Sequence, residues 1–181
     1  MDEELEILFD EETIGRTVRE LGERVSQDYA GKELLLVGIL KGAALFLADL
    51  ARTVTVPAEV AFLRASSYGN STSSAGTVQI TQDVDRDVSG RHVLLVDCII
   101  DSGRTLAAVR ERVLMRRPAS LRSVVLLDKT DRRTTKVPVD YVGFEVPDRF
   151  LVGYGLDRAG QYRNLPYIAA VLQEDDSNSA G

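Results

Sequence analysis

The chain has 181 residues, 44% hydrophobic and 28% charged, which is typical of a soluble globular protein and predicts one domain over residues 1–172. The net charge of −6 argues against nucleic acid or an anionic membrane as a partner, and the sequence shows neither a bilayer-length apolar run nor a basic, apolar targeting segment, so we expect a cytoplasmic protein. The single cysteine, Cys98, cannot form an internal disulfide, which fits a reducing compartment.

The first quarter of the chain predicts a helix, a buried strand and a second helix. Asp10 is placed to cap a helix. The apolar stripe of that helix consists of Ile14, Val18, Leu21 and Val25. Residues 33–39 (ELLLVGI) predict a strand buried on both faces, and residues 40–42 (LKG) predict a turn into a helix over residues 43–51. Lys41 taken alone is best interpreted as a solvated charge, although its place after a buried strand favours a ligand-binding role.

The next segment predicts two strands joined by a serine- and glycine-rich loop. The strands are expected over residues 57–65 and 77–82, and the loop over residues 66–76 (SSYGNSTSSAG). From composition alone this loop could be a slack hairpin connection.

Residues 92–106 (HVLLVDCIIDSGRTL) organise the rest of the chain. Residues 93–96 predict a central strand, after which acidic side chains precede a turn at Asp101-Ser102-Gly103 and a helix over residues 105–115. Backbone N–H groups at such a turn bind anions, and a phosphate is the natural occupant. Carboxylates next to a phosphate repel it unless they bind something else, such as a metal ion, sugar hydroxyls or a proton. The combination therefore indicates a ligand that carries both a phosphate and hydroxyls, a phosphorylated sugar. An N-cap is the structural alternative for Asp101, and His92, at the start of the strand, is interpreted as structural.

The remaining elements complete an α/β pattern. Strands are expected over residues 123–127 and 138–144, and residues 167–172 are expected to close the sheet. Residues 173–181 form an acidic tail that we expect to be flexible. The predicted fold is α/β, with a central, mainly parallel sheet flanked by helices.

Several segments resemble one enzyme family. VLLVDCIIDSGRTL (93–106) resembles the phosphoribosyl-diphosphate loop of the type I phosphoribosyltransferases. Four further segments resemble the bacterial hypoxanthine-guanine phosphoribosyltransferases, in matching order over about residues 5–172: VGILKGA (37–43), SSYGNST (66–72), LLDKT (126–130) and VGFEVPDRFLVGYGLD (142–157). The resemblance implies the type I phosphoribosyltransferase fold, with a small hood and a flexible active-site loop, and a homodimer or homotetramer.

The resemblance also implies an activity and its site residues. The reaction would be Mg²⁺-dependent transfer of the 5-phosphoribosyl group from 5-phosphoribosyl 1-diphosphate to a 6-oxopurine, hypoxanthine or guanine. The residues implied for the phosphoribosyl group and its 5-phosphate are Asp97, Cys98, Asp101, Ser102, Gly103, Arg104 and Thr105. Those implied for the diphosphate are Leu40, Lys41, Gly42 and Arg163, with Ser67 and Tyr68 on the closing loop. Those implied for the purine are Lys129, Phe150, Leu151 and Asp157, and those for magnesium are Asp97 and Asp157.

Particular roles follow from the same resemblance. Asp101 would accept the proton of the purine, and Lys129 would bind its exocyclic oxygen. A cis peptide bond is expected before Lys41, Arg133 is a weaker candidate for the diphosphate, and Phe150 would stack on the purine unless it is ordinary core.

One position departs from the family pattern. The family commonly has two adjacent acids where this chain has Asp97-Cys98, and a thiol offers little to a hard cation or a sugar hydroxyl. If position 98 contacts the ribose, Cys98→Asp should raise catalytic efficiency. The departure leaves open the alternative that this chain is a catalytically impaired regulatory relative that binds nucleotides or RNA. The only local signal for RNA binding is a basic helix face around Arg110 and Arg116, and that face is more simply interpreted as a solvated surface. Preference among hypoxanthine, guanine and xanthine also stays open.

Overall fold

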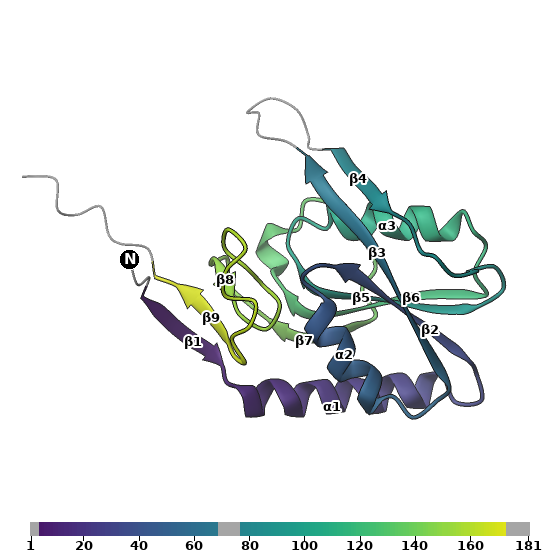
Figure 1. The fold of residues 1–181 in the computed structure, drawn as a ribbon, viewed down its shortest axis with the longest axis horizontal. Coiled ribbons are helices and arrows are strands. Elements are labelled where there is room, and N and C mark those ends of the chain that lie inside the picture. Colours follow the sequence, from purple (N-terminus) through teal and green to yellow (C-terminus); the bar gives the residue numbers. More distant parts are fainter. Residues whose placement is uncertain (1–3, 69–76, 173–181) are drawn as a thin grey trace, which may run out of the picture.

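The computed structural model describes residues 4–68 and 77–172, which form two β-sheets and three α-helices (Figure 1). The strands of the larger sheet are β2 (Leu34–Leu40), β3 (Ala58–Tyr68), β4 (Thr77–Gln82), β5 (His92–Ile100), β6 (Ser120–Asp128) and β7 (Tyr141–Glu145). Those of the smaller sheet are β1 (Leu5–Phe9), β8 (Leu151–Val152) and β9 (Ile168–Val171). The helices are α1 (Glu11–Asp28), α2 (Ala44–Thr53) and α3 (Arg104–Leu114), with a short 3-10 turn η1 (Thr130–Arg132).

The larger sheet has the order β4-β3-β2-β5-β6-β7 and is parallel except for β4, which pairs antiparallel with β3. This confirms the predicted mainly parallel sheet. β5 lies in the middle, between β2 and β6, and its residues 93–96 have no exposed surface. The central strand was therefore predicted correctly from its apolar run.

Helices cover both faces of this sheet, as predicted. Leu94 and Val96 of β5 point to the face where α1 and α2 pack, whereas Val93 and Leu95 point to the face covered by α3. The predicted stripe of α1 is buried, and the Asp10 carboxylate accepts a hydrogen bond of 2.8 Å from the Thr13 N–H, so Asp10 caps the helix as expected.

Several sequence-based boundaries were wrong, among them those of β6, which begins at Ser120 rather than at residue 123, and of β5, which continues to Ile100. β3 continues through Ser66, Ser67 and Tyr68, which were assigned to a loop, because these residues pair with residues 77–79 of β4 in an antiparallel ladder. The side chains of Ser67 and Tyr68, and the rest of the predicted loop over residues 69–76, lie outside the described residues, as does the predicted tail over residues 173–181. β7 begins at Tyr141 rather than at residue 138.

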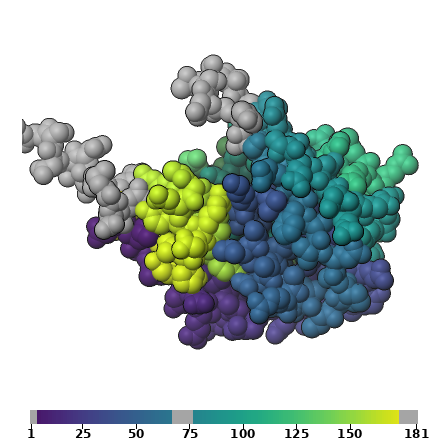
Figure 2. Space-filling view, viewed as in Figure 1, coloured from purple at the N-terminus to yellow at the C-terminus, as the bar shows by residue number. Residues whose placement is uncertain are grey.

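The C-terminal strand does not close the larger sheet, contrary to the expectation from the sequence. β9 lies between β1 and β8 in the separate antiparallel sheet, which we call the hood. The reason is connectivity. The chain between β8 and β9 reverses direction, so the two strands pair with each other antiparallel. The hood packs against the segment around α2, as the yellow and blue surfaces of Figure 2 show, and Leu151 and Ile168 enter the core beneath α1 and α2.

Two smaller expectations can be compared with the structure. His92 is structural, since its Nδ1 lies 2.8 Å from the Ser120 Oγ and its ring packs edge-on against Tyr29. Within residues 4–68 and 77–172, no helix combines the length and the hydrophobicity that crossing a bilayer requires.

Candidate functional site

A cavity of about 220 Å³ lies where the carboxyl ends of β2, β3 and β5 meet. Parallel strands place these ends at one edge of the sheet, which is where open α/β folds bind ligands. The cavity brings the predicted phosphate loop and the predicted diphosphate loop together. Among the predicted site residues, those that line it are Leu40, Gly42, Asp97, Asp101, Ser102, Gly103 and Thr105.

The loop after β5 is held in shape by the chain that follows η1. The Ser102 carbonyl accepts hydrogen bonds from the N–H groups of Thr134 and Thr135, at 3.1 and 3.0 Å. Gly103 has a φ of +87°, and a Cβ there would lie 2.8 Å from the Thr135 carbonyl oxygen. Gly103 is also the N-cap of α3, and the Asp101 carboxylate makes no capping hydrogen bond to this helix; its first N–H, that of Arg104, donates only a long bond of 3.4 Å to the Ser102 Oγ. The N-cap alternative for Asp101 is therefore wrong, and the only capping side chain recorded at the start of α3, Ser102, is held weakly enough to leave these N–H groups to an anion.

Asp97 and Cys98 point to opposite sides of β5, since successive side chains of a strand alternate. Asp97 lines the cavity, and burial raises the pKa of its carboxyl to about 7, against the opposing effect of hydrogen bonds from the N–H groups of Cys98 and Ile99. Cys98 has no exposed surface and belongs to the core beneath α1 and α2, where its thiol donates to the Tyr154 carbonyl at 3.6 Å. Burial also raises the pKa of this thiol. In this arrangement Cys98 cannot touch a ligand in the cavity, so the departure from the family pattern falls on a core position.

Asp101 belongs to a ring of four alternating charges. The Arg132 Nε lies 3.1 Å from the Asp101 Oδ1, and the Lys129 Nζ lies 3.9 Å from the Asp101 Oδ2. Asp148 closes the ring, at 3.8 Å from the Lys129 Nζ and 3.3 Å from the Arg132 Nη1. The hydrogen bond that Arg132 donates to Asp101 and the charges of both acids raise the pKa of Arg132. Lys129 is the buried member of the ring, 8% exposed.

Sequence reasoning missed Arg132 and Asp148 as members of the site. About half of the Arg132 side chain is exposed, as is usual for a surface residue. The available signal was its spacing of three residues from Lys129, which a helical turn such as η1 brings to one side. By contrast, Arg133 forms two hydrogen bonds to the buried Asp128 carboxylate, at 2.8 and 3.1 Å, and does not line the cavity. The structure thus gives Arg133 a structural partner and no contact with the diphosphate loop.

The loop after β2 meets a turn of the hood. The peptide bond between Leu40 and Lys41 is cis, as the resemblance predicted, and Lys41 is exposed. Gly155 has a φ of +95°, and a Cβ built on it would overlap the Gly42 carbonyl oxygen, so only glycine allows this close approach. Arg163 donates from Nη1 to the Gly155 carbonyl at 2.6 Å. The predicted diphosphate residues Gly42 and Arg163 therefore lie on either side of one backbone turn.

None of the predicted purine residues lines the 220 Å³ cavity: Lys129 follows the carboxyl end of β6, whereas Phe150, Leu151 and Asp157 lie in or beside β8 of the hood. Phe150 is 49% exposed and so is not ordinary core, and the Arg158 guanidinium carbon lies 5.5 Å from its ring centroid. Leu151 is buried in β8, which leaves its backbone rather than its side chain as the group that could face a ligand. Asp157 forms a 2.7 Å ion pair with Arg163 and accepts a hydrogen bond from the Gly160 N–H.

The carboxylates fit a magnesium ion that arrives with its substrate better than a protein-built metal cage. Among the described residues, no three His, Cys, Asp or Glu side chains are grouped so that they could hold a metal ion. Mg²⁺ typically takes one or two carboxylates and fills its remaining positions with water and substrate phosphates. Asp97 and Asp157 can supply that number of carboxylates.

Comparison with known proteins adds independent findings. The family profile described as "Phosphoribosyl transferase domain" matches residues 4–159. The hypoxanthine phosphoribosyltransferase of Salmonella typhimurium is 47% identical over 178 residues, which cover 97% of this chain and 100% of that protein. The hypoxanthine-guanine phosphoribosyltransferase of Mycobacterium tuberculosis is 46% identical over 171 residues, 91% of this chain and 85% of that protein. Among solved structures, a hypoxanthine phosphoribosyltransferase from Staphylococcus aureus superposes with a TM-score of 0.89 at 42% identity, covering 96% of this chain and 94% of that one.

Proposed function

The chain belongs to the phosphoribosyl transferase family, and on that premise we propose that it transfers the 5-phosphoribosyl group of 5-phosphoribosyl 1-diphosphate to hypoxanthine or guanine in purine salvage. The products are IMP or GMP and diphosphate. The observation that carries the proposal is the cavity in which Asp97, Asp101 and the Ser102–Thr105 loop face the loop at Leu40 to Gly42. The type I phosphoribosyltransferase fold is common to this chain and its solved relatives.

The phosphate groups of the donor would occupy the two backbone loops. The 5-phosphate binds the N–H groups at the start of α3 with the hydroxyls of Ser102 and Thr105. The diphosphate binds the loop at Leu40 to Gly42 with Arg163, which has donors beyond the one given to the Gly155 carbonyl. Departure of the diphosphate leaves positive charge on the ribose, so electrostatic stabilisation and positioning supply most of the catalysis. Asp97 and Asp157 would be the protein carboxylates that hold Mg²⁺, and the bound ion would neutralise charge on the diphosphate.

The purine would lie between Phe150 and the charge ring. Lys129 donates to the exocyclic oxygen of a 6-oxopurine, and adenine is rejected because its amino group would face another donor. Asp101 accepts the proton of the five-membered-ring nitrogen as that nitrogen attacks the ribose carbon. Contact of Asp101 with two cations, Lys129 and Arg132, keeps its carboxylate oriented toward the cavity. We further expect a cytoplasmic homodimer or homotetramer, which sedimentation analysis would test.

The test is steady-state nucleotide formation from 5-phosphoribosyl 1-diphosphate and Mg²⁺, with hypoxanthine, guanine, xanthine and adenine in parallel. We expect turnover of the 6-oxopurines and a fall in kcat of about 10²-fold or more in Asp101→Asn. Asp131→Asn, which changes an exposed acid close to the same ring, is the matched control and should keep full activity. Absence of turnover with every purine, in a protein that still binds nucleotides, would instead support the regulatory alternative, and salt-dependent RNA binding would identify its RNA-binding form.

A further inference from the structure

Tyr154 stands out because three unusual features coincide in it. It has a φ of +46° and lies between Gly153 and Gly155, both at +95°. A left-handed conformation is uncommon for a residue with a side chain. Its own side chain is almost fully buried, 7% exposed. Glycine would adopt this backbone conformation more readily than tyrosine. The presence of a large side chain here therefore suggests that the side chain itself has a function.

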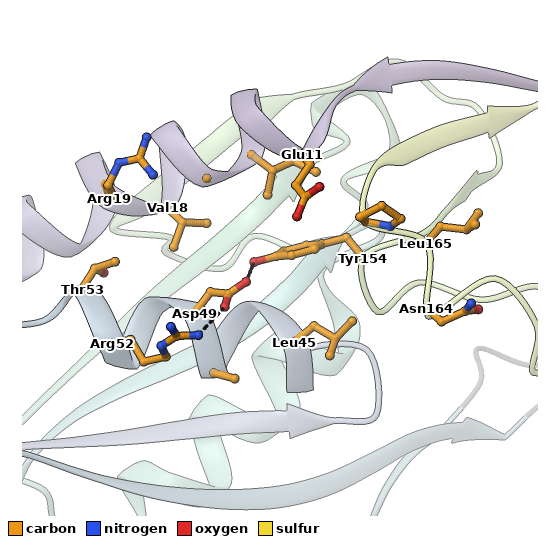
Figure 3. A pocket seen from close by; sticks show the side chains of 14 residues that line it. Glu11, Val18, Arg19, Leu45, Asp49, Arg52, Thr53, Tyr154, Asn164 and Leu165 are labelled. Atoms are coloured by element: carbon orange, nitrogen blue, oxygen red, sulfur yellow. Dashed lines mark hydrogen bonds and ion pairs between the residues drawn. The ribbon is translucent and has the colours of Figure 1, made fainter.

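The Tyr154 side chain ends at helix α2. Its hydroxyl donates a 2.6 Å hydrogen bond to the Asp49 Oδ2, and Figure 3 shows the ring extending from the hood between α1 and α2 to reach this carboxylate. Burial and the Asp49 carboxylate raise the pKa of the phenol, so it stays the donor of this bond. The Tyr154 backbone is fixed as well, because its N–H donates to the Leu165 carbonyl at 2.9 Å and its carbonyl accepts from the Cys98 thiol.

This bond completes a set of contacts that surrounds the diphosphate loop, residues 40–42. Helix α2 begins directly after that loop, and the Ala44 N–H donates to the Lys41 carbonyl at 3.1 Å. On the other side, Gly155 follows Tyr154, packs its backbone onto Gly42 and accepts the Arg163 guanidinium. The hydrogen bond between Tyr154 and Asp49 therefore ties the helix that leaves the loop to the turn that presses on the loop.

We propose that Tyr154 and Asp49 are positioning residues for diphosphate recognition: their hydrogen bond sets the distance between the loop at Leu40 to Gly42 and Arg163. This inference rests on the proposed function and goes beyond it, since neither residue lines the 220 Å³ cavity and neither would touch a substrate. The alternative is that the bond only adds stability to the hood.

The surroundings of the hydroxyl make a clean test possible. Tyr154 and Asp49 also line a second cavity, of about 550 Å³, between α1, α2 and the hood (Figure 3). Asp49 has 47% of its side chain exposed and a 3.7 Å ion pair with Arg52. After Tyr154→Phe, water can therefore hydrate the Asp49 carboxylate, so the variant is expected to fold and not to leave a buried charge unpaired.

The chain also provides a matched control. The Tyr141 hydroxyl donates to the Asp28 Oδ2 at 2.6 Å, the same kind of bond at the same length, from a side chain that is 3% exposed. Tyr141 begins β7, at the edge of the sheet opposite the cavity. Tyr141→Phe thus removes the same kind of bond, together with the 2.9 Å hydrogen bond that the Tyr141 hydroxyl accepts from Arg122, without touching the contacts around the diphosphate loop.

The experiment compares wild type, Tyr154→Phe, Asp49→Asn and Tyr141→Phe in steady-state kinetics, in calorimetric titration with Mg²⁺-diphosphate and in thermal unfolding. In Tyr154→Phe we expect KM for 5-phosphoribosyl 1-diphosphate and Kd for diphosphate to rise about tenfold, as loss of a hydrogen bond to a charged group implies. KM for hypoxanthine should stay within about twofold, and Asp49→Asn should give a smaller effect of the same kind because its amide oxygen still accepts. Tyr141→Phe should lose comparable thermal stability with both constants unchanged.

Two results would overturn the proposal. One is a Tyr154→Phe variant whose constants match those of Tyr141→Phe, which would leave the bond with a structural role only. The other is an equal rise in KM for both substrates, which would indicate general damage. If wild type shows no turnover, the proposed function fails, but the diphosphate titrations still compare the four proteins and still decide whether the bond positions the loop.

Discussion

Replacement of Asp97 by asparagine tests whether the cavity penalises a negative charge in the absence of ligand. Burial raises the pKa of this carboxyl from an ordinary value of 3.8 to about 7. Such a rise disfavours the ionised form in the folded protein by about 4 kcal/mol. Since the side chain keeps some solvent exposure, screening reduces the expected value to about 2 kcal/mol. Asparagine can accept the hydrogen bond that the Cys98 N–H donates to Asp97 at 2.8 Å, so the substitution removes mainly the charge.

The sign of the effect depends on pH. Below pH 4 the carboxyl is protonated in both the folded and the unfolded chain, so it makes no difference. Between pH 4 and 7 the unfolded chain releases its proton while the folded protein retains it, and wild type loses stability relative to Asp97→Asn. Above pH 7 the loss is complete and constant. Asp97→Asn should therefore be more stable than wild type at pH 8 by about 2 kcal/mol, and equal to it near pH 4.

The assay is urea unfolding of both proteins at several pH values from 4 to 8.5, with chelator present and without phosphates. Asp28→Asn is the control with the opposite sign, because the Tyr141 hydroxyl and Arg122 lower the pKa of Asp28. That variant should be less stable than wild type at pH 8, and the difference should persist down to pH 4, since it is lost only as the pH falls from 3.8 through the lower pKa of folded Asp28. A stability difference between wild type and Asp97→Asn that is flat with pH would refute the reasoning, as would a less stable asparagine variant at pH 8.

Three further substitutions give distinct results. Lys129→Gln should raise KM for hypoxanthine about tenfold or more and leave KM for 5-phosphoribosyl 1-diphosphate unchanged, because one charge-assisted hydrogen bond to the purine is lost; equal effects on both constants would contradict its role. Arg132→Ala should lower kcat several-fold, because Asp101 loses the ion pair that orients it. The thermal unfolding temperature should change little, since exposed ion pairs add little stability. An unchanged kcat would show that the ion pair does not orient Asp101. Cys98→Asp should cost about 3 kcal/mol or more in urea unfolding by burying a carboxylate in the core, whereas a stable variant with higher catalytic efficiency would restore the direct ribose role.

The parts of the fold that could be predicted from the sequence are those set by local pattern. The apolar run at residues 93–96 and the stripe of α1 depend only on residue type and spacing, and both were predicted correctly. The position of β9 could not be predicted in this way. Its four residues are all buried, and such a strand would suit an edge of the larger sheet as well as the hood. Which sheet it joins depends on pairing with β1 and β8, and β1 is distant in the sequence.

The candidate site shows the same division between short-range and long-range information. The loop at Asp101 to Thr105 is continuous in the sequence, so its residues alone were enough to predict an anion site there. The charge ring is not continuous, because Asp148 joins it from the segment between β7 and β8. A single sequence gives no distance between such segments, so Asp148 carried no visible signal, whereas Arg132 could be connected with Lys129 only through their spacing of three residues.

Strand alternation explains how the chain can depart from its family at Cys98 and keep a complete cavity. Asp97 faces the cavity and keeps a carboxylate there, whereas position 98 faces the core, where its neighbours are Gly42 and the Tyr154 carbonyl. A thiol is a small, weakly polar group that suits a buried site. The nearby Arg163 guanidinium acts to lower the pKa of the Cys98 thiol, but it already pairs with the Gly155 carbonyl and with Asp157, so an acid at position 98 would have to compete for it in a core where Gly155 packs tightly on Gly42. The same contact that presses these two loops together therefore favours a small, uncharged side chain beneath them.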